Sequence, residues 1–148
     1  MQSSIKSLDG LKTSVQALNN VQERVRENLK MLLHKIEKQK ESVQTQIALS
    51  KSLLVAAQAN EKQKLAVVTQ KSAEFAKASR DLVSCSGIPA VREASELRVA
   101  CCSFKLNEAK NNHAKAVKNR KNMQKKLDLN QKALKILEDT QKQTLQVW

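Results

Sequence analysis

The sequence has few of the residues that build compact cores and sharp turns. It contains no tyrosine, two phenylalanines and one tryptophan, and only two glycines and one proline, among 148 residues. Compact domains draw much of their buried area from aromatic side chains, so this composition disfavours a globular core. No stretch approaches the roughly 20 apolar residues of a membrane span. Residues 1–6 lack the apolar segment of a secretory signal, so we expect a cytoplasmic protein, although export without a signal would leave no trace in the sequence.

Motifs of catalysis and of cofactor binding are missing as well. The chain has no glycine-rich phosphate loop, no HExxH and no GxSxG. Its three cysteines and two histidines lack the spacing of a zinc site, and an odd number of cysteines implies no disulfide framework. Two packed helices would also offer no deep pocket in which catalytic groups could be held. The sequence therefore predicts no enzymatic activity, no cofactor and no metal.

Helix-breaking residues cluster at one place, between Ser84 and Pro89. On either side lie long runs rich in Ala, Leu, Lys and Gln, with apolar residues at helical spacing. We expect Gly87 to adopt the left-handed conformation that ends a helix, and Pro89 to occupy the first turn of the next one. The prediction is all-α: one domain over 1–148, a long antiparallel two-helix coiled-coil hairpin. It has helices at about 3–84 and 90–146 and a bend at 85–89 hinged on Gly87 and Pro89.

Apolar residues of both predicted helices recur in alternating steps of four and three, the heptad pattern of coiled coils. In the first helix this seam gains an extra four-residue step near Ile47 and another near Leu65. Before Ile47, the expected seam positions of the first helix are Leu11, Val15, Leu18, Gln22, Val25, Leu29, Leu32, Ile36, Gln39 and Val43. In the second helix they are Val99, Cys102, Leu106, Ala109, His113, Ala116, Arg120, Met123, Leu127, Asn130, Leu134, Leu137 and Gln141. We expect the polar members Gln22, Gln39, His113, Arg120 and Asn130 to fix the register of the pairing.

The two predicted helices differ in length. Folded about Gly87, the second helix reaches back only to about residue 28, which leaves about 27 residues without a partner. These residues either fold back after Asn19-Asn20 as a short third helix or pair with another molecule. Two helices alone bury little, so we expect a protein partner or a homo-oligomer. The apolar ends that would mediate it are Leu8, Leu11, Val15, Leu18, Leu145 and Trp148.

The net charge is +13, from 27 basic and 14 acidic residues, which favours an acidic partner. Residues 105–126 hold eight basic residues against Glu108 alone. Folding about Gly87 sets this stretch against residues of about 48–69, which do not neutralise it. An exposed basic stripe either contacts a partner or keeps the hairpin soluble. Its lysines are Lys115, Lys118, Lys121, Lys125, Lys132 and Lys135.

Three functions fit this pattern. The first is a non-enzymatic assembly, scaffold or adaptor protein that acts through helix–helix contacts. The second is a nucleic-acid-associated helical protein, in which lysines would contact phosphates without reading sequence. The third, and least favoured, is a subunit of a membrane-active helical assembly, because membrane insertion would need a broader apolar face. The length and the basic, Gln/Lys-rich helices resemble the stalk or escort hairpins of flagellar and type III secretion ATPase complexes. That resemblance covers architecture alone and implies a secretion-type or filamentous assembly.

Overall fold

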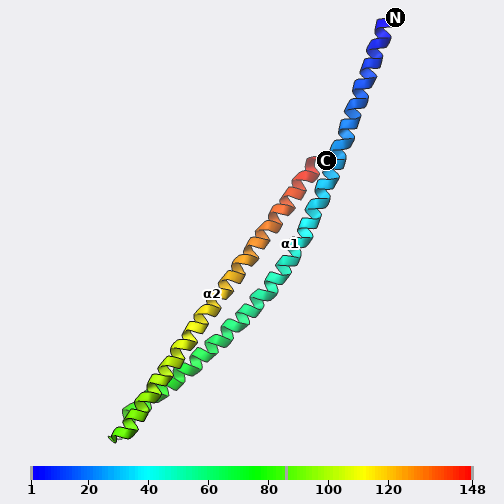
Figure 1. The fold of residues 1–148 in the computed structure, drawn as a ribbon. Coiled ribbons are helices and arrows are strands. Elements are labelled where there is room, and N and C mark those ends of the chain that lie inside the picture. Colours follow the sequence, from blue (N-terminus) through cyan, green and yellow to red (C-terminus); the bar gives the residue numbers. More distant parts are fainter. Residues whose placement is uncertain (1, 86, 148) are drawn as a thin grey trace. The chain divides into compact units, whose positions relative to one another are not determined.

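A computed structural model describes residues 2–85 and 87–147, with side chains from Ser4 onward. The chain forms two α-helices, α1 (Gln2–Ser84) and α2 (Pro89–Val147), which pack against each other as a helical hairpin (Figure 1). The predicted all-α hairpin is confirmed, with helix limits within about two residues of those expected. Trp148 lies outside the described residues.

The contacts of the chain divide it into two units. Unit 1 is Met1–Gln46 with Asn130–Trp148, and unit 2 is Ile47–Leu129. Each unit contains a stretch of both helices, and within each unit those stretches run antiparallel. Each unit can therefore be described from its own contacts between α1 and α2.

The buried core is thin and consists of small or medium apolar side chains. No polar side chain is buried in the part of the chain that the structure describes, and no aromatic ring belongs to the core. Buried alanines on both helices allow close approach at the cost of little buried area per turn, which limits the free energy of unfolding. The core residues are Ile36, Ile47, Leu54, Ala57, Ala78, Leu106, Ala109, Ala116 and Leu127.

The seam of α2 follows the predicted heptad pattern throughout. Every position from Val99 to Gln141 that the sequence assigns to the seam is buried or half-buried in the structure. The pattern extends to Ser95 before this range and to Thr144 after it, both of which are half-buried. The alternation of apolar and polar residues along α2 therefore predicts its packed face correctly.

The seam of α1 differs from the prediction. Leu32 and Gln39 are exposed, and their neighbours Leu33 and Lys40 take the half-buried positions instead. The two extra steps expected near Ile47 and Leu65 do not occur. Past Leu65, Val68, Lys71 and Phe75 continue the steps of four and three, and the seam alternates four and three without interruption from Leu29 to Lys64. Between those limits the residues that are not exposed are Leu29, Leu33, Ile36, Lys40, Val43, Ile47, Ser50, Leu54, Ala57, Glu61 and Lys64.

Polar residues in the seam of α1 explain why a search for apolar residues misplaces part of it. Lys40, Ser50, Glu61 and Lys64 occupy seam positions that an apolar pattern passes over. A lysine can do so because its methylene stem packs against apolar neighbours while its ammonium group reaches out to a partner or to water.

The described part of the bend, Cys85 and residues 87–89, contains no left-handed residue. No described residue, Gly87 included, has a positive φ, so the expectation of a left-handed Gly87 is wrong. The last turn of α1 is instead tightened by the Cys85 amide, which donates to the Leu82 carbonyl at 3.4 Å. Pro89 begins α2 as predicted, and the Arg92 amide donates to the Ile88 carbonyl at 3.1 Å. The proline has no amide hydrogen, but the first amides of a helix lack a partner within it in any case.

We expect Gly87→Ala to raise the free energy of unfolding by about 0.4–1 kcal/mol, because alanine restricts the unfolded chain more than glycine does. A Cβ atom built on Gly87 meets nothing within 4 Å, and the backbone needs no left-handed φ there. Urea unfolding followed by circular dichroism measures the change. A loss of about 1 kcal/mol would contradict this description of the bend, since that is the typical cost of placing alanine at a left-handed position.

The first turns of α2 make no seam contact. Residues 87–94 are exposed, and Ser95 is the first half-buried residue of α2. As a result the pairing within unit 2 is displaced from the one expected for a fold about Gly87. Arg120 contacts Glu61 rather than a residue near Leu54, a shift of about one heptad.

The N-terminal part of α1 extends beyond the contact with α2. All side chains of residues 4–28, which we call the overhang, are exposed, and Leu29 is the first to be half-buried. The predicted length of this unpaired segment is confirmed. The alternative in which this segment folds back as a third helix is wrong, because α1 is continuous from Gln2 through Asn19-Asn20 to Ser84.

Candidate interaction surfaces

An apolar stripe follows the overhang at heptad spacing. The predicted contact residues Leu8, Leu11, Val15 and Leu18 lie on it and are between 50% and 62% exposed. Val25 continues the stripe with similar exposure. Large apolar side chains in regular register on a free helix face are typical of a surface that another helix covers.

The stripe runs into the face of α1 that packs against α2. Steps of three and four residues lead from Leu8 to Val25, and two successive four-residue steps then reach Leu29 and Leu33. One change of phase therefore occurs at Leu29, where the contact with α2 begins, in place of the two extra steps that the sequence predicts near Ile47 and Leu65. A step of this kind relaxes supercoiling locally without interrupting the apolar face.

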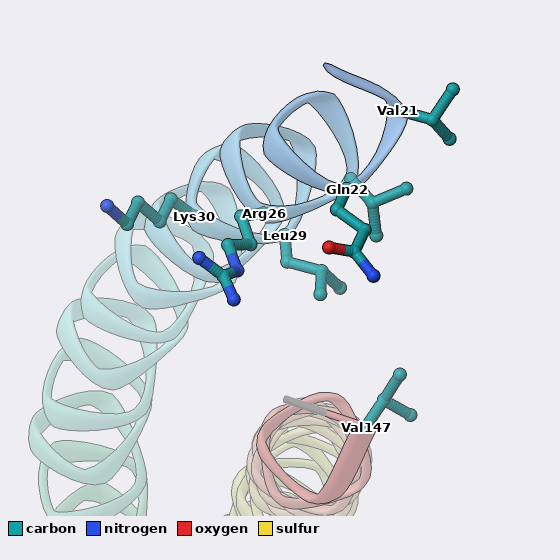
Figure 2. Close-up of a pocket in the computed structure, with 7 residues that line it drawn as sticks. Val21, Gln22, Arg26, Leu29, Lys30 and Val147 are labelled. Carbon is teal, nitrogen blue, oxygen red and sulfur yellow. The ribbon is translucent and has the colours of Figure 1, made fainter. Parts of the chain in front are cut away.

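A surface hollow marks the place where α2 ends beside this face. It is lined by Val21, Gln22, Val25, Arg26, Leu29, Lys30 and Val147. In Figure 2 the side chains of Gln22 and Leu29 point toward the end of α2, and Val147 stands at that end. The seam of unit 1 is thus open at its N-terminal side. At the end of α2 itself, the predicted contact residue Leu145 is exposed, and Trp148 lies outside the described residues.

The predicted register residues fall into two groups. His113, Arg120 and Asn130 are half-buried in the seam of α2, where the sequence places them. Gln39 is exposed, and its predicted seam position belongs to Lys40. Gln22 is exposed in the overhang, at the open end of the seam. Neither glutamine therefore packs into the core of the hairpin.

In unit 1 Gln141 makes a polar contact across the seam. The Lys40 ammonium donates to its Oε1 at 2.9 Å, and its Nε2 donates to Glu37 Oε2 at 2.9 Å. The amide can satisfy both neighbours because it carries a donor and an acceptor. Gln141 thus joins a basic and an acidic residue of α1, one helical turn apart.

In unit 2 the corresponding contact is an ion pair between Arg120 and Glu61, whose side chains are 31% and 23% exposed. The expectation that α1 leaves the basic stretch of α2 unneutralised is therefore wrong for Arg120. A second pair, Arg98 with Asp81 at 3.0 Å, lies nearer the bend and is about half exposed. Partial burial makes the loss of one partner more costly for the first pair than for the second.

The lysines of the predicted basic stripe remain at the surface. All six are exposed, and none forms an ion pair with a residue that the structure describes. Their role as a contact surface stays a prediction. The set is Lys115, Lys118, Lys121, Lys125, Lys132 and Lys135.

Two apolar surfaces were missed by the analysis of the sequence. Leu97 and Phe104 lie on the side of α2 away from the seam and are 72% and 70% exposed. In unit 1 an apolar groove runs beside the seam between Val43 on α1 and Ile136 on α2. The signal for the first was present in the seven-residue spacing of Leu97 and Phe104, outside the heptad seam. The groove between Val43 and Ile136 could not be predicted without the observed register of α1 against α2.

Other kinds of site find no support in the described part of the chain. No group of three or more His, Cys, Asp or Glu side chains is placed to hold a metal ion in residues 2–85 and 87–147. Cys85, Cys101 and Cys102 are free thiols. Over the same residues, neither helix has a stretch both long and apolar enough to cross a bilayer.

Comparison with models of protein families, with curated proteins and with solved structures finds no significant match to this chain. The candidate surfaces therefore rest on the geometry described above.

Proposed function

We propose that the chain is a non-enzymatic assembly protein, a scaffold or adaptor, that acts through helix–helix contacts of its overhang. The observation that carries this proposal is the exposed apolar stripe of residues 4–28, which continues into a face that already packs against a helix. Exposed apolar area of this extent is uncommon on a monomer and usually marks an interaction site.

The helical state of the overhang supports the same function. Outside its contact with α2, the helix of residues 4–28 depends on intrinsic propensity alone, although most helical stability in proteins comes from packing. Gly10 weakens it further, by about 1 kcal/mol relative to alanine. A covering helix would supply the missing stabilisation by removing the stripe from water, at about 25 cal/mol per Å².

The basic stripe of α2 is the alternative contact surface, with nucleic acid or an acidic protein as its partner. It carries less weight because an exposed lysine is fully solvated and needs no partner, whereas an exposed leucine gains free energy when it is covered. The overhang also lacks an excess of one charge, with four basic and three acidic residues between Ser4 and Asn28. Its contacts are therefore expected to be apolar in origin.

The test replaces three stripe residues together, Leu11→Ser, Val15→Ser and Leu18→Ser. Each loses about 1.5–3 kcal/mol of burial in a complex, so association is expected to weaken by more than 100-fold. Sedimentation of the untagged chain, purified and in extracts of the cells that make it, measures the association. Hydrogen exchange of the overhang amides reports whether they are protected in the complex.

A matched control introduces the same number of serines into the same segment and spares the stripe. It carries Lys12→Ser, Gln16→Ser and Asn19→Ser, each one residue after a stripe position and exposed. The control is expected to associate like the parent chain. The proposal is wrong if the parent is monomeric in both preparations with unprotected overhang amides, or if both variants associate equally.

A further inference from the structure

We infer that the overhang of one chain pairs with the overhang of a second copy, antiparallel and about a twofold axis. This inference rests on the proposed function and names the partner. Its starting point is the open end of the seam in unit 1, where the packed face of α1 continues past Val147 without a covering helix (Figure 2).

The existing interface indicates what the missing helix must be like. Along unit 1, α1 packs against an antiparallel helix whose half-buried residues, apolar and polar, alternate in steps of three and four. The overhang has apolar residues at this same spacing. In a second copy it is also as long as the face that it would cover, since the uncovered face is the overhang itself. An antiparallel copy would continue the line of α2, with its N-terminal end next to the C-terminal end of α2.

One register covers the whole stripe of both chains. When Leu8 faces Val25 of the second copy, Leu11 faces Gln22 and Val15 faces Leu18. Each such contact then occurs twice, which is the property of a twofold interface. In this register Ser4 of the second copy lies beside Leu29, so the new contact begins where the contact with α2 ends.

The charges of the overhang favour a second copy over an acidic partner. The chain as a whole carries +13, but residues 4–28 carry only one net positive charge. Two overhangs therefore repel each other little.

The area available suits a reversible dimer. Five apolar stripe positions on each copy, buried to the extent usual for Leu and Val, remove on the order of 1,000 Å² from water. Stable interfaces start at about 1,200 Å², so the expected dimer is of moderate strength and depends on concentration. Micromolar affinity is the expected scale.

Disulfide trapping tests both the partner and the direction. Leu8→Cys and Val25→Cys are made as separate variants of the full chain, mixed, and equilibrated in a thiol–disulfide buffer, and the linked peptides are identified by mass spectrometry. We expect the mixed 8–25 disulfide to exceed either homodisulfide by at least about tenfold, because only this pair is opposed. The parent chain reports links through its native cysteines.

The control pair is Lys6→Cys with Glu27→Cys, which is level in the same register but lies on the outer face of the overhang. It is expected to give no excess of the mixed disulfide. An excess of the 8–8 and 25–25 disulfides would overturn the antiparallel arrangement. Random linkage, together with sedimentation as a monomer at every concentration, would overturn the dimer.

Failure of this inference is distinguishable from failure of the proposed function. If the purified chain stays monomeric but sediments in cell extracts as a complex with a different protein, and the triple serine variant does not, the second copy is the wrong partner and the assembly role stands. If the chain is monomeric in extracts as well, both fail.

Discussion

We expect Leu127→Ala to lower the free energy of unfolding by about 2–4 kcal/mol, the usual cost of removing a buried leucine side chain. Leu127 is 6% exposed and is one of nine buried residues in the described part of the chain, five of which have large side chains. A domain of this size has a total stability of only about 5–15 kcal/mol, so one such change removes a large part of it. Urea unfolding followed by circular dichroism at 222 nm measures the loss.

Leu129 provides the matched control for this change. It lies two residues further along α2 and is 64% exposed. Leu129→Ala removes the same atoms with the same change in helix propensity, and we expect a loss within about 0.5 kcal/mol. Equal losses at the two positions would mean that the heptad face of α2 is not the packed one.

The second large effect concerns Glu61 and Arg120. Replacing either residue alone by leucine leaves the other charge half-buried without its partner, and we expect a loss of about 1–3 kcal/mol. Replacing both by leucine removes the two charges together, and we expect a stability equal to or above that of the parent chain. The single variants lose stability and the double variant does not, because a buried ion pair stabilises little more than apolar packing does, while an unpaired buried charge is costly.

A double-mutant cycle measures this effect as a coupling between the two positions, and the expected coupling is the sum of the two single losses, about 2–6 kcal/mol. The pair of Asp81 and Arg98 is the control, since both side chains are about half exposed. The same cycle there is expected to give less than about 1 kcal/mol. If the Glu61 and Arg120 changes were simply additive, their contact would not contribute to the pairing of α1 with α2.

Much of the fold could be predicted because it depends on local signals. Ser84 to Pro89 is the one cluster of helix breakers, and the steps between apolar residues identify the face of α2 from Val99 to Gln141. The face of α1 was harder to find, since Lys40 and Glu61 occupy seam positions for reasons that lie on the other helix. Lys40 reaches Gln141 and Glu61 reaches Arg120, and neither contact is visible in the sequence of α1 alone.

The displacement of the pairing by about one heptad has a similar origin. The sequence locates the bend, but it does not say how many residues of α2 pass before the helices meet. In the structure this happens at Ser95. The candidate surface was easier to predict, because the overhang follows from the unequal lengths of the helices. The missed surfaces around Phe104 and Ile136 require knowledge of which faces are already covered.

The polar contacts of Gln141 and Arg120 oppose the sliding of one helix along the other. A repeating apolar seam would allow one helix to slip along the other by seven residues, about 10 Å, while leucines still met leucines. Such a slip would carry Arg120 away from Glu61 and set it beside apolar Leu54 or Val68, and it would separate Gln141 from Lys40. In each unit a polar contact therefore opposes translation along the helix axis. A force along that axis would have to break these contacts before one helix could shift by a heptad relative to the other.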